Sequence, residues 1–245
     1  MVDAVLEVDN IDVRFGVLLA LREVALSAPA GQVTGLIGPN GAGKTTLFNV
    51  ITGLQQPTRG TVMIGGVNVT SLKPHVRARQ RVARTFQRLE VFGALTAREN
   101  ILVGAEIRNK WDSVTEDPHR VAEEILERIG LSAVADRPVD AMPTGTARLV
   151  ELGRALAIRP KLLLLDEPGS GLDPEETHAL GDLLTELSND GMAILLVEHD
   201  VELVMRICKE LYVLDFGEVI AHGTPRQVQA DGAVQKAYLG AEVPV

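Results

Sequence analysis

The pattern of apolar and polar positions predicts strands that alternate with helices. Ile11, Val13 and Phe15 alternate with Asp12 and Arg14, which is the period of a half-buried β-strand. Helical stretches begin at Lys44 and separate the last three strand-like runs. In all, five short and mainly apolar strand-like runs follow, at residues 33–37, 61–64, 162–165, 193–197 and 211–214. Buried strands alternating with helices predict an α/β fold with a largely parallel sheet.

The middle of the chain has a different pattern. Residues 106–120 are polar and rich in turn formers, and an apolar repeat at helical spacing (Val121, Ile125, Ile129) then ends at Gly130, a C-cap residue. We expect a single domain over residues 1–245, with an inserted helical subdomain at 88–150. The core would comprise residues 1–87 and 151–222, followed by a C-terminal tail at 223–245.

Charge and cysteine content narrow the class of protein. The net charge is −9, whereas nucleic-acid binders usually carry a basic surface. We therefore predict no nucleic-acid partner and expect the denser basic stretch from Arg77 to Arg88 to be a solvated face. The single cysteine, Cys208, has apolar neighbours, which predicts a buried structural thiol.

Two segments bear on membrane association. Residues 1–4 lack a basic region, so we expect no signal peptide. Residues 24–43 carry no charge and are long enough to span a bilayer, but they include Pro29, Pro39 and several glycines. We expect strand, turn, strand and loop there.

A phosphate-binding loop is the strongest chemical signal. Gly38, Gly43, Lys44 and Thr45 match G-x-x-x-x-G-K-[ST], between a predicted strand and a predicted helix. The glycines allow backbone N–H groups to converge on phosphate oxygens, and the helix N-terminus adds positive potential. Lys44 would pair with the β- and γ-phosphates, and the Thr45 hydroxyl would bind Mg²⁺.

Acidic and polar residues follow other predicted strands. Asp166 and Glu167 end the leucine run and suit a Mg²⁺ ligand and a base for the attacking water. His199 follows the next strand and could bind the γ-phosphate, and Gln87 could contact Mg²⁺ or the water. Phe15 could stack on adenine, although its spacing is equally typical of a core residue.

Together these residues resemble the nucleotide-binding subunit of an ATP-binding cassette (ABC) transporter. The resemblance covers essentially the whole chain and follows the family's order: Phe15, the Walker A motif Gly38-Pro39-Asn40-Gly41-Ala42-Gly43-Lys44-Thr45 with Thr46, Gln87, a signature region near Gly145, the Walker B residues Asp166-Glu167, the D-loop Ser170-Gly171-Leu172-Asp173, and switch His199. It implies a RecA-like P-loop core with an antiparallel β subdomain and an inserted α-helical subdomain.

The family also implies partners and ligands. Two subunits, identical or different, would bind two ATP molecules and Mg²⁺ between the Walker A loop of one and the signature Gly145 and Asp173 of the other. Permease subunits in the membrane would dock on the helical subdomain and the loop after Gln87, including the apolar segment 89–95, for which a core placement is the alternative. The chain would lie at the cytoplasmic face of the inner membrane.

A narrower resemblance concerns the cargo. The segments 84–87 and 95–100 and the tail, with Gly223-Thr224-Pro225 and Ala237-Tyr238-Leu239-Gly240, are similar to importers of branched-chain amino acids. Relatives with similar tails export lipopolysaccharide or take up urea and amides, so those functions remain alternatives, as does a soluble or regulatory ABC ATPase with weak turnover.

The signature region departs from the family pattern. Where the family has Leu-Ser-Gly-Gly-Gln or Leu-Ser-Tyr-Gly-Gln, this chain has Met142-Pro143-Thr144-Gly145-Thr146. Proline lacks the serine hydroxyl and the backbone N–H. Thr144 or Thr146 could replace the hydroxyl. We hypothesise that the chain works beside a different ATPase subunit whose signature is intact, and that its own signature completes the weaker of the two sites.

Overall fold

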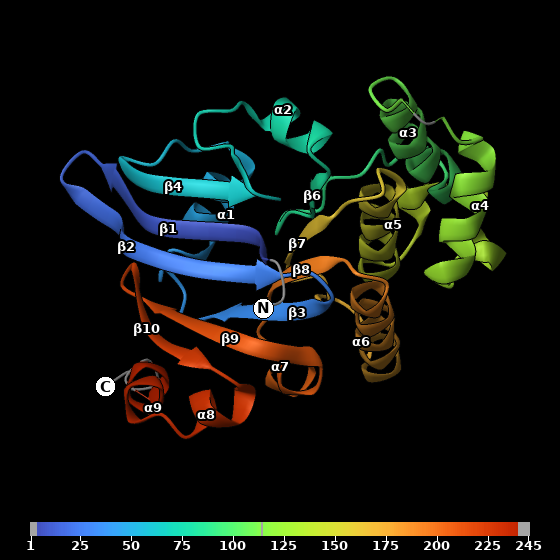
Figure 1. The fold of residues 1–245 in the computed structure, drawn as a ribbon. Helices are drawn as coiled ribbons and strands as arrows, with labels where there is room; N and C mark the ends of the chain where they lie inside the picture. The colour runs from blue at the N-terminus through green and yellow to red at the C-terminus, as the bar shows by residue number, and fades with distance from the viewer. Residues whose placement is uncertain (1–3, 114, 240–245) are drawn as a thin grey trace.

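The computed structural model describes residues 4–113 and 115–239 and contains two sheets flanked by helices (Figure 1). Residues 1–3 and Gly240, which entered the expectations above, lie outside the described residues. No helix in the described part of the chain is long and apolar enough to cross a membrane. The stretch at 24–43 instead forms the end of β2, a turn, β3 and a loop, as its composition predicts.

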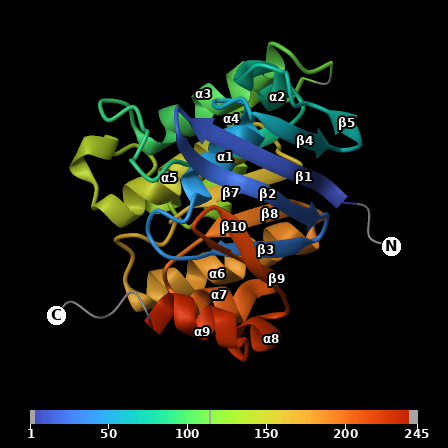
Figure 2. The same cartoon turned by 90° about the vertical axis from the view of Figure 1, so that its left-hand side faces the viewer.

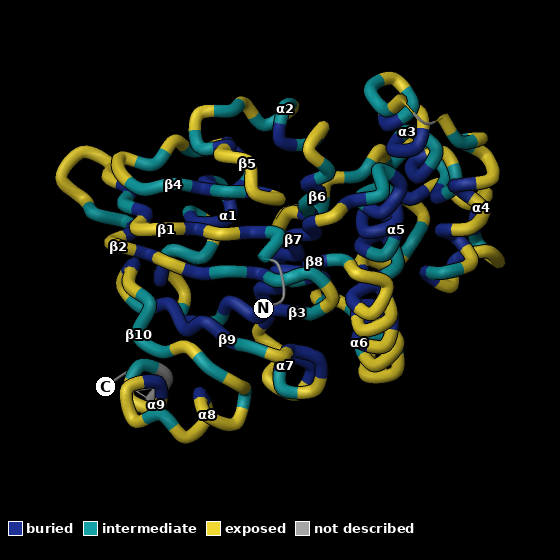
Figure 3. The backbone as a smooth tube through the Cα atoms, in the orientation of Figure 1, coloured by how far each residue is buried: buried dark blue, intermediate teal, exposed yellow. Residues whose placement is uncertain are grey.

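The larger sheet has six strands in the order β10-β9-β3-β8-β7-β6. All neighbours are parallel except β9 and β10. The bounds are β3 Gln32–Ile37, β6 Val82–Arg84, β7 Leu162–Asp166, β8 Ala193–Val197, β9 Cys208–Asp215 and β10 Glu218–Gly223. Because β7 and β8 lie inside the sheet, every residue in them is buried (Figure 3).

The smaller sheet is antiparallel, with the strand order β2-β1-β4-β5. Its strands are β1 Ala4–Phe15, β2 Leu18–Pro29, β4 Arg59–Ile64 and β5 Val67–Asn68. It packs over α1 (Lys44–Thr52) and one face of the larger sheet, in a core that includes Phe48, Leu162 and Leu164. The other face, with Leu163 and Leu165, packs on helices. This alternation follows from the period of two in a strand.

The remaining helices cover the opposite face and the two ends of the molecule (Figure 2). They are α2 Pro74–Arg79, α3 Ala97–Asn109, α4 Pro118–Arg128, η1 Ser132–Val134, η2 Val139–Ala141, α5 Thr144–Ala157, α6 Pro174–Asn189, α7 Val201–Ile207, α8 Pro225–Gln229 and α9 Gly232–Leu239. Figure 1 shows α3, α4 and α5 grouped beside the sheets, as the inserted helical subdomain requires. The predicted boundary after residue 150 falls within α5.

Helix α3 extends into the stretch 106–120, which the sequence analysis described as polar and rich in turn formers. It begins at a capping box between Thr96 and Glu99 and continues through the polar residues 106–109, which were expected to form turns. Arg108 explains the difference, because its side chain is 6% exposed and Nη1 lies 2.6 Å from Glu116 Oε1. At this point of the helix a charged side chain, paired with Glu116, occupies a buried position. The apolar residues whose spacing normally predicts a helix are therefore missing from the sequence here.

The basic stretch from Arg77 to Arg88 is not a uniformly solvated face. Arg77 is 1% exposed, and its guanidinium donates hydrogen bonds to the carbonyls of Val50 and Ile51 at the end of α1, at 2.7 and 2.8 Å. The Arg84 side chain is 6% exposed. The expectation of a solvated face was wrong at these two positions, because each arginine has buried acceptors within reach. Cys208 is buried, as predicted.

Candidate active site

The phosphate-loop sequence forms a tight loop between β3 and the start of α1. Gly38 and Gly43 have φ values of 151° and 109°, and a Cβ on Gly38 would lie 2.0 Å from the Leu214 carbonyl oxygen. Only glycine fits such a position. Nζ of Lys44 donates to the carbonyls of Gly38 and Pro39 at 2.6 and 3.0 Å. The loop thus curls around a cationic group at a helix N-terminus, an arrangement suited to anions.

A pocket of about 330 Å³ opens beside this loop. Its lining combines the loop, the first turn of α1 and residues that follow three other strands. These residues are Asn40, Gly41, Ala42, Gly43, Lys44, Thr45, Thr46, Gln87, Asp166, Glu167 and Val197. The fold therefore brings the predicted Walker A, Walker B and Gln87 positions, which are far apart in the sequence, to one site.

Glu167 is held from several sides at the edge of this pocket. Its backbone N–H donates to the Val197 carbonyl at 2.9 Å, and its φ of 53° is left-handed. Oε1 accepts a hydrogen bond from Gln87 Nε2 at 3.3 Å and lies 2.9 Å from Nε2 of His199. The left-handed backbone conformation of Glu167 costs a non-glycine residue roughly 1–3 kcal/mol, and residues in this conformation are often found at functional sites.

Burial and neighbouring charges shift two pKa values in the pocket. Burial raises the pKa of Asp166, an effect that Arg84 and Lys44 oppose and Glu167 reinforces. Burial lowers the pKa of Lys44, and the carboxylates of Glu167 and Asp166 act in the opposite direction. Opposite charges are thus concentrated where phosphate oxygens and a cation would bind.

Six predicted site residues are absent from the lining of this pocket among the described residues: Gly38, Pro39, His199, Phe15, Gly145 and Asp173. Gly38 and Pro39 belong to the phosphate loop itself, and His199 contacts Glu167. Phe15 ends β1 and is 49% exposed, so it is not a core residue. Gly145 is buried against the D-loop of its own chain, where a Cβ would lie 2.6 Å from the Gly171 carbonyl oxygen. Asp173 is the N-cap of α6 and accepts a hydrogen bond from the Glu176 N–H at 2.8 Å.

The altered signature lies at the start of α5. Pro143 is the N-cap residue and provides no side-chain cap, and Thr144 is the first residue of the helix. A serine at this position could cap the helix or donate to a ligand, whereas proline can do neither.

Glu198 is a buried carboxylate that the sequence analysis did not identify. It is 8% exposed, and it accepts hydrogen bonds from the backbone N–H groups of Gly169 at 2.6 Å and His199 at 3.0 Å. Burial raises its pKa, while these N–H donors and that of Asp200 act to lower it. Glu198 therefore ties the loop after Glu167 to the backbone of His199. The one sequence signal was its place directly before His199.

Helix α5 holds the segment that follows β6. Arg148 Nη2 donates to the Gln87 carbonyl at 2.7 Å. Oε1 of Glu151 accepts from the backbone N–H groups of Phe86 and Glu90, each at 3.3 Å. The helix that begins at the signature is thus connected directly to the segment that contains Gln87.

The residues in the pocket fit Mg²⁺ bound together with a phosphate ligand. Thr45, Gln87 and Asp166 supply oxygen atoms within one pocket. No cluster of three or more acidic, histidine or cysteine side chains suited to a metal occurs among the described residues. Mg²⁺ is usually bound by one or two carboxylates, waters and substrate phosphates rather than by such a cluster.

Comparison with known proteins identifies the family and the fold. Residues 21–170 match the family described as ABC transporter, and residues 218–244 match the family described as branched-chain amino acid ATP-binding cassette transporter. Among solved structures, a nucleotide-free ATP-binding cassette from an ABC transporter superposes with a TM-score of 0.87, at 33% identity over 96% of this chain and 99% of the other. The predicted fold class is therefore confirmed.

Curated relatives match this chain over most of their length. The chain is 39% identical to the high-affinity branched-chain amino acid transport ATP-binding protein BraF of Pseudomonas aeruginosa, over 96% of this chain and 98% of that protein. It is 39% identical to LivG of Escherichia coli K12, which has the same description, over 98% and 99%. The lipopolysaccharide export protein LptB of E. coli K12 is 33% identical over 90% of each chain. This chain accordingly belongs to the ABC transporter family, as an ATPase subunit of the branched-chain amino acid transporter type.

Proposed function

We propose that the pocket hydrolyses ATP by in-line attack of water on the γ-phosphate, with Glu167 as the base. The observation that carries this proposal is the contact of Glu167 with both His199 and Gln87. Lys44 and the loop N–H groups would bind the β- and γ-phosphates. The water oxygen forms the new bond to phosphorus, Glu167 accepts the water proton, and the bond to the bridging oxygen breaks to release ADP and phosphate.

Thr45, Asp166 and Gln87 would hold Mg²⁺. A bound Mg²⁺ would neutralise charge that develops on the phosphate oxygens. His199 would donate a hydrogen bond to the γ-phosphate. In the structure, Nε2 of His199 lies 2.9 Å from Oε1 of Glu167. To bind the γ-phosphate, the imidazole would exchange this contact with the base for a contact with the substrate.

A second ATP-binding subunit would complete the site. Gly145 and Asp173 lie outside the phosphate pocket of their own chain, which suits residues that act across a head-to-tail dimer. Phe15, with its ring half-exposed, would stack on adenine. Because Pro143 lacks the signature hydroxyl, we propose a heterodimer in which the partner supplies the intact signature.

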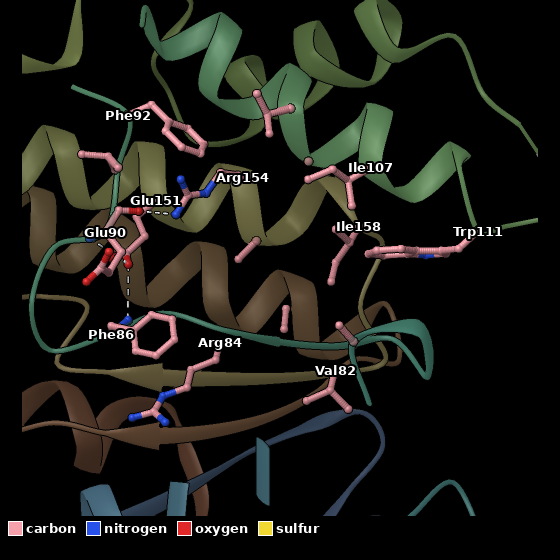
Figure 4. A pocket seen from close by; sticks show the side chains of 16 residues that line it. Val82, Arg84, Phe86, Glu90, Phe92, Ile107, Trp111, Glu151, Arg154 and Ile158 are labelled. Carbon is pink, nitrogen blue, oxygen red and sulfur yellow. Dashed lines mark hydrogen bonds between the residues drawn. The ribbon is translucent and has the colours of Figure 1, made fainter. Parts of the chain in front are cut away.

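A groove beside α3 and α5 would receive the permease subunits. It has a volume of about 550 Å³, and Figure 4 shows Phe86, Phe92, Ile107 and Trp111 along it. Phe92 and Ile107 are 49% and 39% exposed. Exposed apolar side chains in a groove are typical of an interaction surface. The groove adjoins the segment after Gln87, so a docked helix of the permease would contact the same segment that reaches Glu167.

The cargo would be branched-chain amino acids taken up from outside the cell, with the subunit at the cytoplasmic face of the inner membrane. Support comes from the match of the tail at residues 218–244 and from relatives that are 39% identical. The lipopolysaccharide export relative of E. coli is less similar, at 33%.

Reconstitution tests this function. The complex isolated from detergent-solubilised membranes is placed in proteoliposomes containing ATP, and uptake of radiolabelled leucine, isoleucine and valine is measured against a Glu167→Gln complex. ATP-dependent uptake that the substitution abolishes supports the proposal. Robust ATP hydrolysis without uptake of any of the three would contradict the cargo but not the ATPase assignment.

A further inference from the structure

Arg84 is a buried arginine directly beside the proposed cation ligand. Its Nη2 lies 3.2 Å from Oδ2 of Asp166, and the two side chains are 6% and 4% exposed. Desolvation of two charges largely cancels the attraction between them, so a buried pair is weak evidence of a contribution to stability. In addition, Nε of Arg84 is buried without a hydrogen-bond partner in the described structure. These costs indicate that the position serves another purpose.

The guanidinium of Arg84 is fixed from several directions. Nη1 donates to Oδ1 of Asn49 at 2.6 Å, and Cζ lies 5.3 Å and 4.8 Å from the ring centroids of Phe48 and Phe86. A planar guanidinium anchored by hydrogen bonds and aromatic faces has little freedom to reorient. The orientation of the Asp166 carboxylate is therefore fixed as well.

Arg84 also links two of the three proposed ligands of the cation, Thr45 and Asp166. Asn49 and Phe48 lie on α1, the helix whose first turn contains Thr45. Through Arg84, Asp166 at the end of β7 is joined to that same helix. With Oδ2 held by Arg84, Oδ1 can face a cation in the pocket that Asp166 shares with Thr45.

The same side chain borders the groove on the other side of β6. Arg84 and Phe86 both line the groove, and Figure 4 shows the Arg84 guanidinium below the Phe86 ring. Arg84 thus lines the groove and also contacts Asp166, which lines the phosphate pocket.

We propose that Arg84 is a positioning residue for Mg²⁺, which holds the Asp166 carboxylate in the orientation that binds the cation together with ATP. Arg84 acts through Asp166 and would contact neither Mg²⁺ nor ATP. This inference rests on the proposed Mg²⁺ site at Thr45, Asp166 and Gln87. Loss of a residue that orients a metal ligand typically weakens metal affinity about 10–100-fold.

The test compares nucleotide binding with and without the cation, so it does not depend on turnover. The dissociation constant of a fluorescent, slowly hydrolysed ATP analogue is measured in EDTA and in excess Mg²⁺ for the wild type, Arg84→Met and Arg84→Lys. In Arg84→Met, binding in EDTA should be unchanged because Lys44 and the loop are intact. Binding of the analogue to Arg84→Met in Mg²⁺ should weaken about 10–100-fold. Arg84→Lys keeps the positive charge but not the planar set of N–H donors, so its affinity in Mg²⁺ should lie between those of the wild type and Arg84→Met.

Control variants separate this role from a general effect on the fold. Arg79→Met removes an exposed arginine from α2 and should behave as the wild type does. Asn49→Leu leaves the Arg84–Asp166 ion pair in place but removes the hydrogen bond from Arg84 to Asn49. It should therefore weaken nucleotide binding in Mg²⁺ by a smaller factor than Arg84→Met does, and leave binding in EDTA unchanged. That variant also provides the test if Arg84→Met does not fold, as judged by circular dichroism.

Two results would overturn the role of Arg84. In the first result, the Arg84 variants bind the ATP analogue in Mg²⁺ as tightly as the wild type or more tightly. In the second, their affinity for the analogue falls by the same factor in EDTA and in Mg²⁺. A wild type whose nucleotide binding ignores Mg²⁺ would instead overturn the cation site itself, and the role of Arg84 with it.

Discussion

Nε2 of His199 lies 2.9 Å from Oε1 of Glu167, although 32 residues separate them in the sequence. Each follows the end of its own strand, and β7 and β8 are parallel neighbours, so the two side chains meet at one edge of the sheet. The same Glu167 oxygen accepts a hydrogen bond from Gln87. The proposed base, which follows β7, is therefore positioned by residues that follow two other strands, β8 and β6.

We predict that His199→Ala lowers turnover more than ATP binding. The substitution removes one hydrogen bond with a charged partner, worth roughly 1.5–3 kcal/mol, so kcat should fall about 10–100-fold. The phosphate loop and Lys44 keep their contacts with the phosphates, so the ATP dissociation constant should rise by less than kcat falls. Steady-state kinetics and nucleotide binding measure the two effects, and a His199→Ala chain with wild-type kcat would contradict the role.

Glu198→Leu should destabilise the chain and impair turnover together. The buried N–H groups of Gly169 and His199 would lose their acceptor, and each unsatisfied group costs about 1–3 kcal/mol. Urea unfolding followed by circular dichroism gives the change in the free energy of unfolding. Glu202→Gln, an exposed acidic residue on α7, is the matched control. Equal stability of both variants would show that Glu198 does not anchor these loops.

Pro143→Ser should strengthen ATP-driven dimerisation of the chain. A restored hydroxyl can donate to a phosphate of the partner's ATP, and such a bond would tighten the dimer about tenfold or more. Sedimentation in a Glu167→Gln background, where ATP is not consumed, measures the dimer affinity. If dimerisation and turnover are both unchanged, the altered signature is functional as it stands and the heterodimer hypothesis is wrong.

Cys208 should be unreactive in the folded protein. Burial raises the pKa of its thiol to about 12, and the thiolate is the reactive form, so almost none of it is present at pH 8. Native protein treated with iodoacetamide at that pH should remain unlabelled, whereas protein in guanidinium should be labelled fully. Rapid labelling under native conditions would mean that β9 opens readily.

Local motifs made much of the site predictable from the sequence. The residues of the phosphate loop are consecutive in the sequence, so a short motif identifies them. Asp166 and Glu167 directly follow an apolar run, so the end of a predicted strand coincides with residues that can bind a cation or act as a base. The parallel order of the strands then determines which ends meet. Phe15 had two open interpretations because exposure depends on the facing sheet, which spacing alone does not reveal.

Buried charges were the features that the sequence did not predict. Arg77, Arg84 and Arg108 are interior side chains whose partners lie on other elements. A basic residue is normally expected in solvent, and only tertiary structure reveals an acceptor within reach. The same reason explains why a helix was not expected at residues 106–109 and why Glu198 was missed.

The most direct measurement is steady-state ATP hydrolysis by the purified chain, across protein concentration, compared with Glu167→Gln. A general base contributes about 10²–10⁴-fold to a rate, so the variant should lose turnover by that factor while it still binds ATP. Cooperative dependence on concentration would indicate a competent homodimer and would contradict the proposed heterodimer. A Glu167→Gln chain that keeps wild-type turnover would contradict the proposed mechanism.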